Sequence, residues 1–533
     1  MPSRAAAALP GALVAVLLGL LLPGPTPAAA AAVKARPAGS FVDSVGVDVH
    51  TAFSDTPYVS EFATVEARLE ELGVHHVRDD LFPSRPDQYQ RLDDLAAAGI
   101  GSTLVMGSPA NGTPGLEGLL STAAGLDGLE ALEGPNEYST SGDPEWKPHL
   151  VAYQEALYAK AKASPALAAL PVIGPSIVHN DQAALGDVST SLDLGNIHSY
   201  PQGNPPDKLG SFIAKAELNS GAKPIVATET GYDTMEGWKG ENPAVSEGAM
   251  ATYVPRLFLE YFRWGIARTF SYELLDEFPD PQLEDKEAHF GLLRNDLSPK
   301  PAFDALRNTI RILEDPGPTF APGSLDYGLA EAGVAFPGPE SSGLHKVLLQ
   351  KRDGSFYLAL WRLQSVWDPA SGTALPAPAE PVEVSVAPGL ESAAEFLPNS
   401  SVQPVWSVTR PSQPLSIPVG PQVVILRLVP GAADAGGPQT PALPPPTTAG
   451  AAAVTPSEPA KDPEATARPR CVVPRLTGRR LSAGRTRLRA SECRLGRVGG
   501  ERSGASRVTG QHPRPGRVLA AGSRVSVTLG QSD

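Results

Sequence analysis

The chain has 533 residues, 41% of them hydrophobic, with 56 prolines and 52 glycines. At about 150 residues per domain, this length excludes a single ordinary domain and predicts two to four. The formal net charge is −14, but residues 468–533 contain 15 arginines and no lysine against three acidic residues, so an acidic body precedes a basic tail. Such a tail suits an anionic surface, such as a cell-wall polymer or lipid headgroups, and GC-rich coding explains the arginines equally well.

Residues 1–32 have the pattern of a signal peptide. Arg4 provides a positive start, Gly11–Leu22 form an apolar core, and Pro25–Ala32 supply the small residues at which such segments are cleaved. The core is shorter than the roughly 20 residues that span a membrane, so we expect removal rather than an uncleaved anchor. No later apolar stretch approaches that length. We therefore expect a chain without a transmembrane segment after signal removal, secreted or associated with the cell wall, where nucleic acid is not the expected partner.

Between residues 41 and 314, apolar runs of strand type alternate with segments whose apolar residues recur at helical spacing. The predicted strands are 41–50, 74–80, 100–107, 128–138, 170–178, 192–201, 224–233 and 266–277, and the predicted helices are 59–73, 87–99, 114–125, 145–164, 207–221, 244–265 and 301–314. This α/β alternation predicts a (β/α)8 TIM barrel. The alternative, an open doubly wound sheet, would bring a glycine-rich phosphate loop after the first strand, and the sequence VDVHTAF there has none.

After residue 314 the pattern changes. Short alternating runs between residues 317 and 430, such as SFYLALWRL (355–363), predict a β-sandwich domain. Residues 431–469 are rich in Pro, Ala and Thr and predict an extended linker, and 470–530 form a small α+β module. The two cysteines of the chain, Cys471 and Cys493, lie in that module. In an exported protein we expect them to pair rather than to remain free thiols.

Polar side chains stand at the carboxyl ends of the predicted barrel strands, where TIM barrels carry their active sites. His198 and Tyr200 are two residues apart on one strand and therefore share a side. The full set is Arg78, Asn136, Glu137, His198, Tyr200, Glu229 and Tyr272, with Asp48 and His50 as weaker candidates after the first strand. Convergence of these groups on one rim predicts a substrate site.

Glu137 and Glu229 are the candidate catalytic pair. Glycoside hydrolysis needs one neutral carboxyl to protonate the leaving oxygen and one ionised carboxylate to attack the sugar or to activate water. We expect Arg78 to keep Glu229 ionised, Tyr200 to donate to it and Asn136 to bind the sugar 2-hydroxyl. A carboxyl separation of about 5–5.5 Å would indicate a retaining mechanism and about 6.5–9.5 Å an inverting one.

The motifs EGPNEY (133–138), NIHSYP (196–201) and ATETGYD (227–233) resemble glycoside hydrolases of clan A. The resemblance implies a retaining mechanism with Glu137 as acid/base, Glu229 as nucleophile and Asn136 at the 2-hydroxyl; Arg78, His198 and Tyr200 match supporting positions. Two departures concern the substrate subsite. Met106 and Ser108 follow the third strand where many members have a histidine or asparagine, and Tyr272 stands where many have a sugar-stacking tryptophan. Trp146 and Trp238, in the loops after strands four and seven, are candidates to stack on sugar rings, with ordinary packing as the open alternative.

The C-terminal stretch CVVPRLTGRRLSAGRTRLRASECRLGRV (471–498), with VTGQHPRPGRVLAAGSRVSVTL (508–529), resembles a PASTA domain. This resemblance implies a module associated with peptidoglycan recognition, although many such modules serve as spacers. We expect an exported glycosidase that acts on an oligo- or polysaccharide. The alternatives are a non-catalytic wall-binding protein that retains a sugar cleft, and a transglycosidase. No Cys, His or acidic cluster has metal-ligand spacing, and we expect neither a metal nor a cofactor.

Overall fold

The computed structural model of the chain describes residues 32–331, 334–335, 343–431 and, with gaps, 470–530. Nearly all of the predicted signal peptide (1–32) and linker (431–469) lies outside these residues. Within the described part of the chain, no helix combines the length and the apolar character that crossing a membrane requires.

A parallel eight-stranded sheet has the order β7–β6–β5–β4–β3–β10–β9–β8. A parallel bridge between Ile173 at the end of β7 and Leu194 before β8 closes it into a barrel, which confirms the predicted fold class. The strands are β3 (Val45–Asp48), β4 (His76–Asp80), β5 (Gly101–Val105), β6 (Leu129–Glu133), β7 (Val172–Ile173), β8 (Gly195–His198), β9 (Ile225–Thr230) and β10 (Thr269–Ser271).

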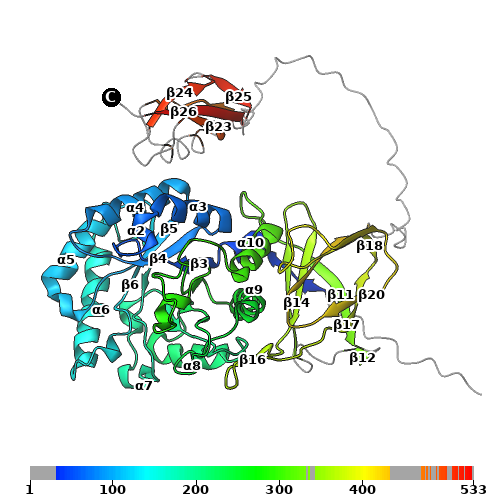
Figure 1. Cartoon of the computed structure of the whole chain (residues 1–533), viewed down its shortest axis with the longest axis horizontal. Helices are drawn as coiled ribbons and strands as arrows, with labels where there is room; N and C mark the ends of the chain where they lie inside the picture. The colour runs from blue at the N-terminus through cyan, green and yellow to red at the C-terminus, as the bar shows by residue number, and fades with distance from the viewer. Residues whose placement is uncertain are drawn as a thin grey trace, which may run out of the picture.

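Helices surround this sheet (Figure 1). Two of them end where the sequence predicts, at Gly73 and Gly99, whose φ angles of 87° and 85° lie in the left-handed region that glycine enters most easily. The helices are α3 (Phe62–Leu72), α4 (Pro86–Ala98), α5 (Gly112–Ala123), α6 (Trp146–Ala163), α7 (Gln182–Leu185), α8 (Leu209–Ser220), α9 (Glu247–Trp264) and α10 (Pro301–Leu313), with the short α1 (Ala38–Val42) and α2 (Pro57–Ser60) near the start.

Several strands are shorter than the apolar runs that predict them. The run 41–50 begins inside helix α1, where Phe41 is fully buried and packs edge-on against Phe262 of α9, with ring centroids 5.5 Å apart. The runs 170–178 and 266–277 contribute only the two-residue β7 and the three-residue β10. A short apolar run reports burial, and burial alone does not distinguish a strand from a helix or a buried loop.

The second domain is a sandwich of two mostly antiparallel sheets (Figure 1). Apolar residues such as Leu358, Val384 and Leu426 fill the space between them. One sheet contains β1 (Val33–Lys34), β11 (Ser324–Glu331), β12 (Val334–Ala335), β17 (Glu380–Ala387) and β20 (Leu415–Val419); the other contains β2 (Arg36–Pro37), β13 (Leu344–Gln350), β14 (Phe356–Arg362), β18 (Leu390–Phe396), β19 (Trp406–Thr409) and β21 (Val424–Pro430). A separate β-ribbon joins β15 (Trp367–Asp368) to β16 (Thr373–Ala374).

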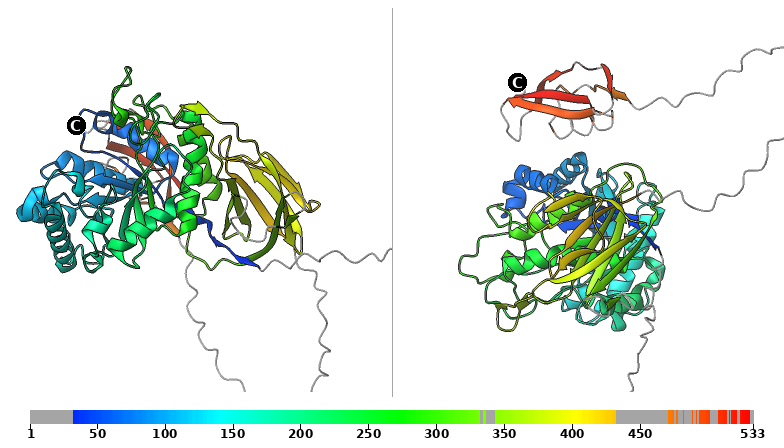
Figure 2. Two further views of the ribbon diagram at one scale, coloured as in Figure 1. Left: turned by 90° about the horizontal axis from the view of Figure 1, so that it is seen from below. Right: turned by 90° about the vertical axis from the view of Figure 1, so that its right-hand side faces the viewer.

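Barrel and sandwich lie side by side (Figure 2), and one cluster of buried apolar residues includes side chains of both. Helix α9, which is buried along almost its whole length, packs with Trp361 of β14 in this core. Nη1 of Arg256 on α9 donates to the carbonyls of Arg362 and Gln364 at 2.8 and 2.9 Å. Strands β1 and β2 precede the barrel in the sequence, but they belong to the two sheets of the sandwich.

The C-terminal module contains a three-stranded sheet in which β26 (Ser523–Gly530) pairs in parallel with β23 (Cys493–Gly500) and antiparallel with β24 (Arg507–His512). A second pair joins β22 (Arg470–Val472) to β25 (Val518–Ala520). Cys471 and Cys493 form a disulfide with an S–S distance of 2.04 Å, as expected. The stretch AGRTRLRASEC (483–493), which the resemblance to a PASTA domain predicts to be helical, lies mostly outside the described residues.

Candidate active site

A cavity of about 650 Å³ opens at the carboxyl ends of the barrel strands. It lies within the size range of small-ligand sites, which is about 300–1,000 Å³. Seven of the eight barrel strands, or the loops that follow them, contribute to its wall. Among the residues of that wall are His50, Arg78, Asn136, Glu137, His198, Tyr200, Glu229 and Tyr272. The structure therefore brings together most of the polar residues that the sequence places at strand ends.

Glu137 and Glu229 face each other across His198. Nδ1 of His198 lies 2.7 Å from Oε1 of Glu137 and 3.4 Å from Oε2 of Glu229. One carboxylate oxygen of each glutamate and the ring nitrogen lie within 4.8 Å of one another. This short separation resembles that of retaining glycosidases, in which the carboxyl groups are about 5–5.5 Å apart.

The two carboxylates differ in their surroundings. The side chain of Glu229, on the buried strand β9, is 10% exposed, whereas that of Glu137 is 31% exposed. Oε1 of Glu229 accepts a hydrogen bond of 2.8 Å from Nη1 of Arg78, and Oε2 accepts one of 2.8 Å from the hydroxyl of Tyr200. Both oxygens of Glu229 are therefore held in place, and Glu137 is the more accessible of the pair.

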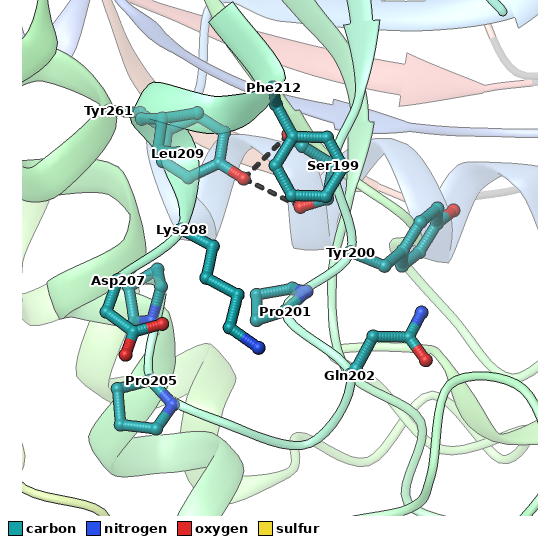
Figure 3. A pocket seen from close by; sticks show the side chains of 11 residues that line it. Ser199, Tyr200, Pro201, Gln202, Pro205, Asp207, Lys208, Leu209, Phe212 and Tyr261 are labelled. Carbon is teal, nitrogen blue, oxygen red and sulfur yellow. Dashed lines mark hydrogen bonds between the residues drawn. The ribbon is translucent and has the colours of Figure 1, made fainter. Parts of the chain in front are cut away.

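The alternation of side chains after β8 aims His198 and Tyr200 at the cavity. Ser199 between them turns the other way, and its hydroxyl lies 2.8 Å from that of Tyr261 on α9. Figure 3 shows this arrangement, with Ser199 facing Tyr261 and Tyr200 pointing away from it. The residue spacing therefore determines which two polar groups of NIHSYP reach the site.

Arg78 is the centre of a buried charge network that sequence reasoning described only in part. Its Nε and Nη2 donate to the two carboxylate oxygens of Glu133 at 2.7 and 3.0 Å, and Nη2 also donates to Oδ1 of Asn136 at 2.8 Å. Glu133, the last residue of β6, is fully buried and also accepts from Asn196 and Thr228. Glu133 was not predicted as a site residue, although an acidic residue at the end of an otherwise apolar strand is itself a signal.

The backbone at Glu137 adopts a left-handed conformation, with φ 44°. Such angles are uncommon for residues other than glycine and concentrate at functional sites. The backbone N–H of Glu137 donates to the hydroxyl of Ser176 at 2.9 Å, and that hydroxyl donates to Oδ1 of Asn136 at 3.2 Å. Ser176 thus fixes both members of the Asn136–Glu137 pair. It follows the short strand β7, and the sequence analysis did not select it.

Charges within the site shift two pKa values in opposite directions. Burial alone would raise the pKa of Glu137, but the hydrogen bond from His198 and the nearby charges of His198 and Arg78 outweigh it and hold that pKa below 4.5. Burial would lower the pKa of His198, but Glu229 and Glu137 outweigh it and raise that pKa above 6.5. In the sugar-free site the proton therefore favours His198 over Glu137, whereas a general acid must be protonated.

The three groups are also near enough to suggest a metal site, but one distance argues against that reading. Two ligands of one metal ion, each bound at 2.0–2.2 Å, lie about 2.9 Å or more apart. His198 and Glu137 are 2.7 Å apart, which is the length of a charge-assisted hydrogen bond.

Aromatic side chains complete the cavity, and some of them were predicted from the sequence. Tyr272 lines it, as expected, and the peptide bond to Glu273 is cis. Phe53 and Phe290, from long loops, also line it and were not selected from the sequence. His50 contributes to the same wall, and burial lowers its pKa to about 3.

The two tryptophans expected to stack on sugar lie elsewhere. Trp146 begins α6 and packs against an apolar cluster that contains Leu150 and Ile177. Trp238 donates from Nε1 to the carbonyl of Glu241 at 2.8 Å within its own loop, and its ring does not line the cavity. Position in a loop after a barrel strand was too weak a criterion, because such loops also have apolar cores to fill.

Comparison with known proteins identifies related folds. No protein-family model matches the chain, and no curated protein sequence matches it. A β-1,3-glucanosyltransferase from Rhizomucor miehei is 20% identical and covers 50% of this chain and 97% of its own, with a TM-score of 0.40. A family 39 glycoside hydrolase from Bacteroides cellulosilyticus is 16% identical and covers 74% of this chain and 81% of its own, with a TM-score of 0.50. At this identity the likeness is one of fold, and the described chain shares its architecture with that family 39 glycoside hydrolase.

Proposed function

We propose that the protein is a glycoside hydrolase that cleaves a β-glycosidic bond of an oligo- or polysaccharide with retention of configuration. The observation that carries this proposal is the approach of Glu137 and Glu229 to within 4.8 Å in a cavity at the carboxyl ends of the barrel strands. Their unequal surroundings support unequal roles. Glu229, held at both oxygens, is the nucleophile, and the more accessible Glu137 is the acid/base.

In the first half-reaction a carboxylate oxygen of Glu229 attacks the anomeric carbon. The bond from that carbon to the leaving oxygen breaks, and the carboxyl of Glu137 gives its proton to the leaving oxygen. The product is a glycosyl ester on Glu229. Arg78 and Tyr200 orient the attacking carboxylate, because each holds one of its oxygens.

In the second half-reaction water attacks the same carbon from the face that the leaving group vacated. Glu137 accepts a proton from this water, and the bond to Glu229 breaks to restore the carboxylate. Two inversions give net retention. The proton that Glu137 accepts restores it as the acid for the next cycle. His198, which is 2.7 Å from Glu137 and has a raised pKa, is the adjacent group that can hold this proton in the sugar-free site.

Asn136 is placed to bind the sugar 2-hydroxyl. Its Oδ1 accepts hydrogen bonds from Arg78 and Ser176, which leaves the Nδ2 amide as the donor available to a ligand in the cavity. A hydrogen bond to the 2-hydroxyl strengthens as the oxocarbenium-like transition state forms, so this contact would contribute to rate.

Three finer assignments are part of the same proposal. The barrel (41–314) belongs to clan A of the glycoside hydrolases, on the motifs around Glu137, His198 and Glu229. The chain is exported by residues 1–32. The module at 470–530, beyond the sandwich (317–430) and the linker (431–469), is a PASTA-like domain that places the enzyme on peptidoglycan, supported by its disulfide and its excess of arginine.

A turnover comparison on the full chain tests the proposal. Wild type, Glu229→Gln and the control Glu236→Gln are assayed on chromogenic β-glycosides and on cell-wall polysaccharides. Glu236 lies on the same loop system but is exposed and does not line the cavity. We expect wild type and the control to release product, and Glu229→Gln to bind the sugar without turning it over.

Two results would change the assignment. Sugar binding without turnover in all three proteins would identify a non-catalytic carbohydrate-binding protein. Turnover that yields lengthened oligosaccharides rather than hydrolysis products would identify a transglycosidase, which shares the first half-reaction but transfers the sugar to another sugar.

A further inference from the structure

A second cluster of ionisable side chains lies in the cavity wall, apart from the Glu137–Glu229 pair. His50 follows β3, and Glu273 and Glu277 follow β10. All three are at least nine-tenths buried, with exposed fractions of 8%, 0% and 7%. They approach one another only because β3 and β10 are neighbours in the barrel. The spacing of these residues in the sequence gives no metal-ligand signature.

The cluster contains polar atoms without hydrogen-bond partners among the described residues. These atoms are both ring nitrogens of His50, Oε1 of Glu273 and Oε1 of Glu277. Nε2 of His50 lies 3.6 Å from Oε2 of Glu273 and 3.7 Å from Oε1 of Glu277, which is too long for hydrogen bonds. Buried polar atoms are almost always satisfied, so an arrangement of four such atoms indicates a missing partner.

The two glutamates also lack a compensating positive charge. Three other buried carboxylates of the barrel each have a cation: Glu229 has Arg78, Asp276 has Lys300 and Glu260 has Arg263. Among the described residues the ion-pair contacts of Glu273 and Glu277 are with His50 alone. An uncompensated buried carboxylate is strongly unfavourable, and two adjacent ones are more so. A bound dication would neutralise the pair.

The distances fit one metal ion at the centre of the cluster. Ligands bound at 2.0–2.2 Å with tetrahedral angles lie about 3.3–3.6 Å apart. The observed 3.6 and 3.7 Å approach this value, and one donor atom of each residue lies within 4.8 Å of the other two. We propose that His50, Glu273 and Glu277 form a binding site for a divalent cation of the zinc type.

The surroundings support the site in the manner expected of metal ligands. The hydroxyl of Tyr58 accepts a 3.3 Å hydrogen bond from the N–H of Leu275, which leaves its proton to donate to Oε2 of Glu273 at 2.8 Å. The ring of His50 stacks on Phe53, with centroids 4.6 Å apart and planes 12° from parallel. A hydrogen bond such as that from Tyr58 orients a ligand carboxylate, and one imidazole with two carboxylates is a donor set that zinc accepts. A water or substrate oxygen would take the fourth position.

This ion would brace the wall of the cavity. His50 and Tyr272 both line the cavity, and their rings meet edge-on at 5.8 Å. Bound metal would join the loop after β3 to the segment after β10 directly behind this contact. The site does not depend on the proposed hydrolytic activity and is tested without it.

The test measures Zn²⁺ binding by the full chain. The purified protein is stripped with a chelator, dialysed against Zn²⁺, Mg²⁺ or buffer, and analysed for metal content and melting temperature. Co²⁺ serves as a spectroscopic probe of coordination by nitrogen and oxygen. The variants are Glu277→Gln, Glu284→Gln as the matched exposed control on the following loop, and Glu229→Gln to exclude the other cluster.

We expect wild type, Glu284→Gln and Glu229→Gln to bind about one Zn²⁺ per chain and to melt at a higher temperature with Zn²⁺ than with Mg²⁺. We expect Glu277→Gln to bind less than about a tenth as much Zn²⁺ per chain as wild type. Wild type that binds no Zn²⁺, or Glu277→Gln that binds as much as wild type, would overturn the proposal. Should Glu277→Gln fail to fold, the Zn²⁺-specific melting shift and the Co²⁺ spectrum of wild type decide the question.

Discussion

The carboxylates of Glu137 and Glu229 come from strand ends that are not adjacent in the barrel, yet they approach within 4.8 Å of each other. Glu137 follows β6, and Glu229 lies on β9, three strands farther around the closed sheet through β7 and β8. His198, on the strand next to β9, lies between them. The barrel thus places one accessible and one tightly held carboxylate on either side of a cavity.

Replacing Glu137 by Gln should affect substrates according to their leaving groups. General acid catalysis contributes about 10²- to 10⁴-fold, so hydrolysis of an unactivated alkyl β-glycoside should fall by that factor. A dinitrophenyl β-glycoside needs no protonation to leave, and its burst of phenolate release should persist. Steady-state and burst kinetics measure both. Glu145→Gln, an exposed substitution on the same loop, should leave both rates unchanged, and an equal loss on both substrates would contradict the acid/base role.

Replacing Arg78 by Met should destabilise the fold as well as abolish activity. It would leave the buried carboxylates of Glu133 and Glu229 without their cation. Breaking a buried ion pair in this way costs about 3–5 kcal/mol. Urea unfolding measures the free energy. Arg352→Met is the control, because that arginine pairs with Asp315 near the surface, where ion pairs are worth about 0–1 kcal/mol. Equal losses of unfolding free energy in the two variants would show that Arg78 does not compensate the buried negative charges of Glu133 and Glu229.

The contact between His198 and Glu137 should stabilise the protein within a defined pH window. The folded pKa of His198 is raised, so its contribution is complete below pH 6.5 and is lost as the pH rises through the folded value. The folded pKa of Glu137 is lowered, so its contribution is complete above pH 4.5 and is lost as the pH falls through the folded value.

Melting temperatures of wild type and His198→Asn, measured from pH 3 to pH 9, test this window (the range brackets both ordinary pKa values, about 4.3 and 6.5). The difference in melting temperature between wild type and His198→Asn should be largest between pH 4.5 and 6.5 and should become smaller below and above this range. In a Glu137→Gln background the pH dependence of this difference should shrink. A difference that stays constant with pH would mean that His198 contributes packing alone.

The barrel should not fold without the sandwich. The core that holds α9 includes Trp361 of β14, and the entering strand β2 pairs with β13. A chain that ends at residue 316 would expose this apolar face, whereas residues 32–431 retain both sheets. We expect cooperative thermal unfolding by circular dichroism for 32–431 and aggregation or a non-cooperative signal for 32–316. Cooperative unfolding of the shorter chain would show that the barrel is an independent unit.

Local sequence patterns were sufficient to predict the barrel and the approach of Glu137 to Glu229. Alternation of apolar runs with helical segments predicted the closed parallel sheet, and the closure itself appears in the Ile173–Leu194 bridge. Because parallel strands all end at one rim, polar residues after β4, β6, β8 and β9 were expected to converge there, and they lie around one cavity. Boundaries were less predictable, since Asn136 and Glu137 follow β6 in a turn rather than on the strand.

Long-range packing explains what the sequence analysis missed. Ser176 and Phe290 reach the site from irregular segments that have no periodic pattern. Residues 33–37 are too few to show a strand pattern, yet they pair with sandwich strands more than 280 positions later, as in Val33 with Leu325. The clustering of the unsatisfied polar atoms of His50, Glu273 and Glu277 is produced by the fold and leaves no pattern in the sequence. Trp146, at the start of α6, packs against Leu150 and its neighbours rather than in the cavity wall, a contact that its position in the sequence does not specify.

The most direct test of the catalytic pair is to trap the glycosyl-enzyme. The protein is incubated with a 2-deoxy-2-fluoro β-glycoside of the sugar that it hydrolyses best, and its peptides are analysed by mass spectrometry. Fluorine slows both steps, and a good leaving group allows the ester to accumulate. The account predicts a sugar adduct on the peptide that contains Glu229, absent in Glu229→Gln and accumulated in Glu137→Gln. An adduct on another residue, or full turnover by Glu229→Gln, would contradict it.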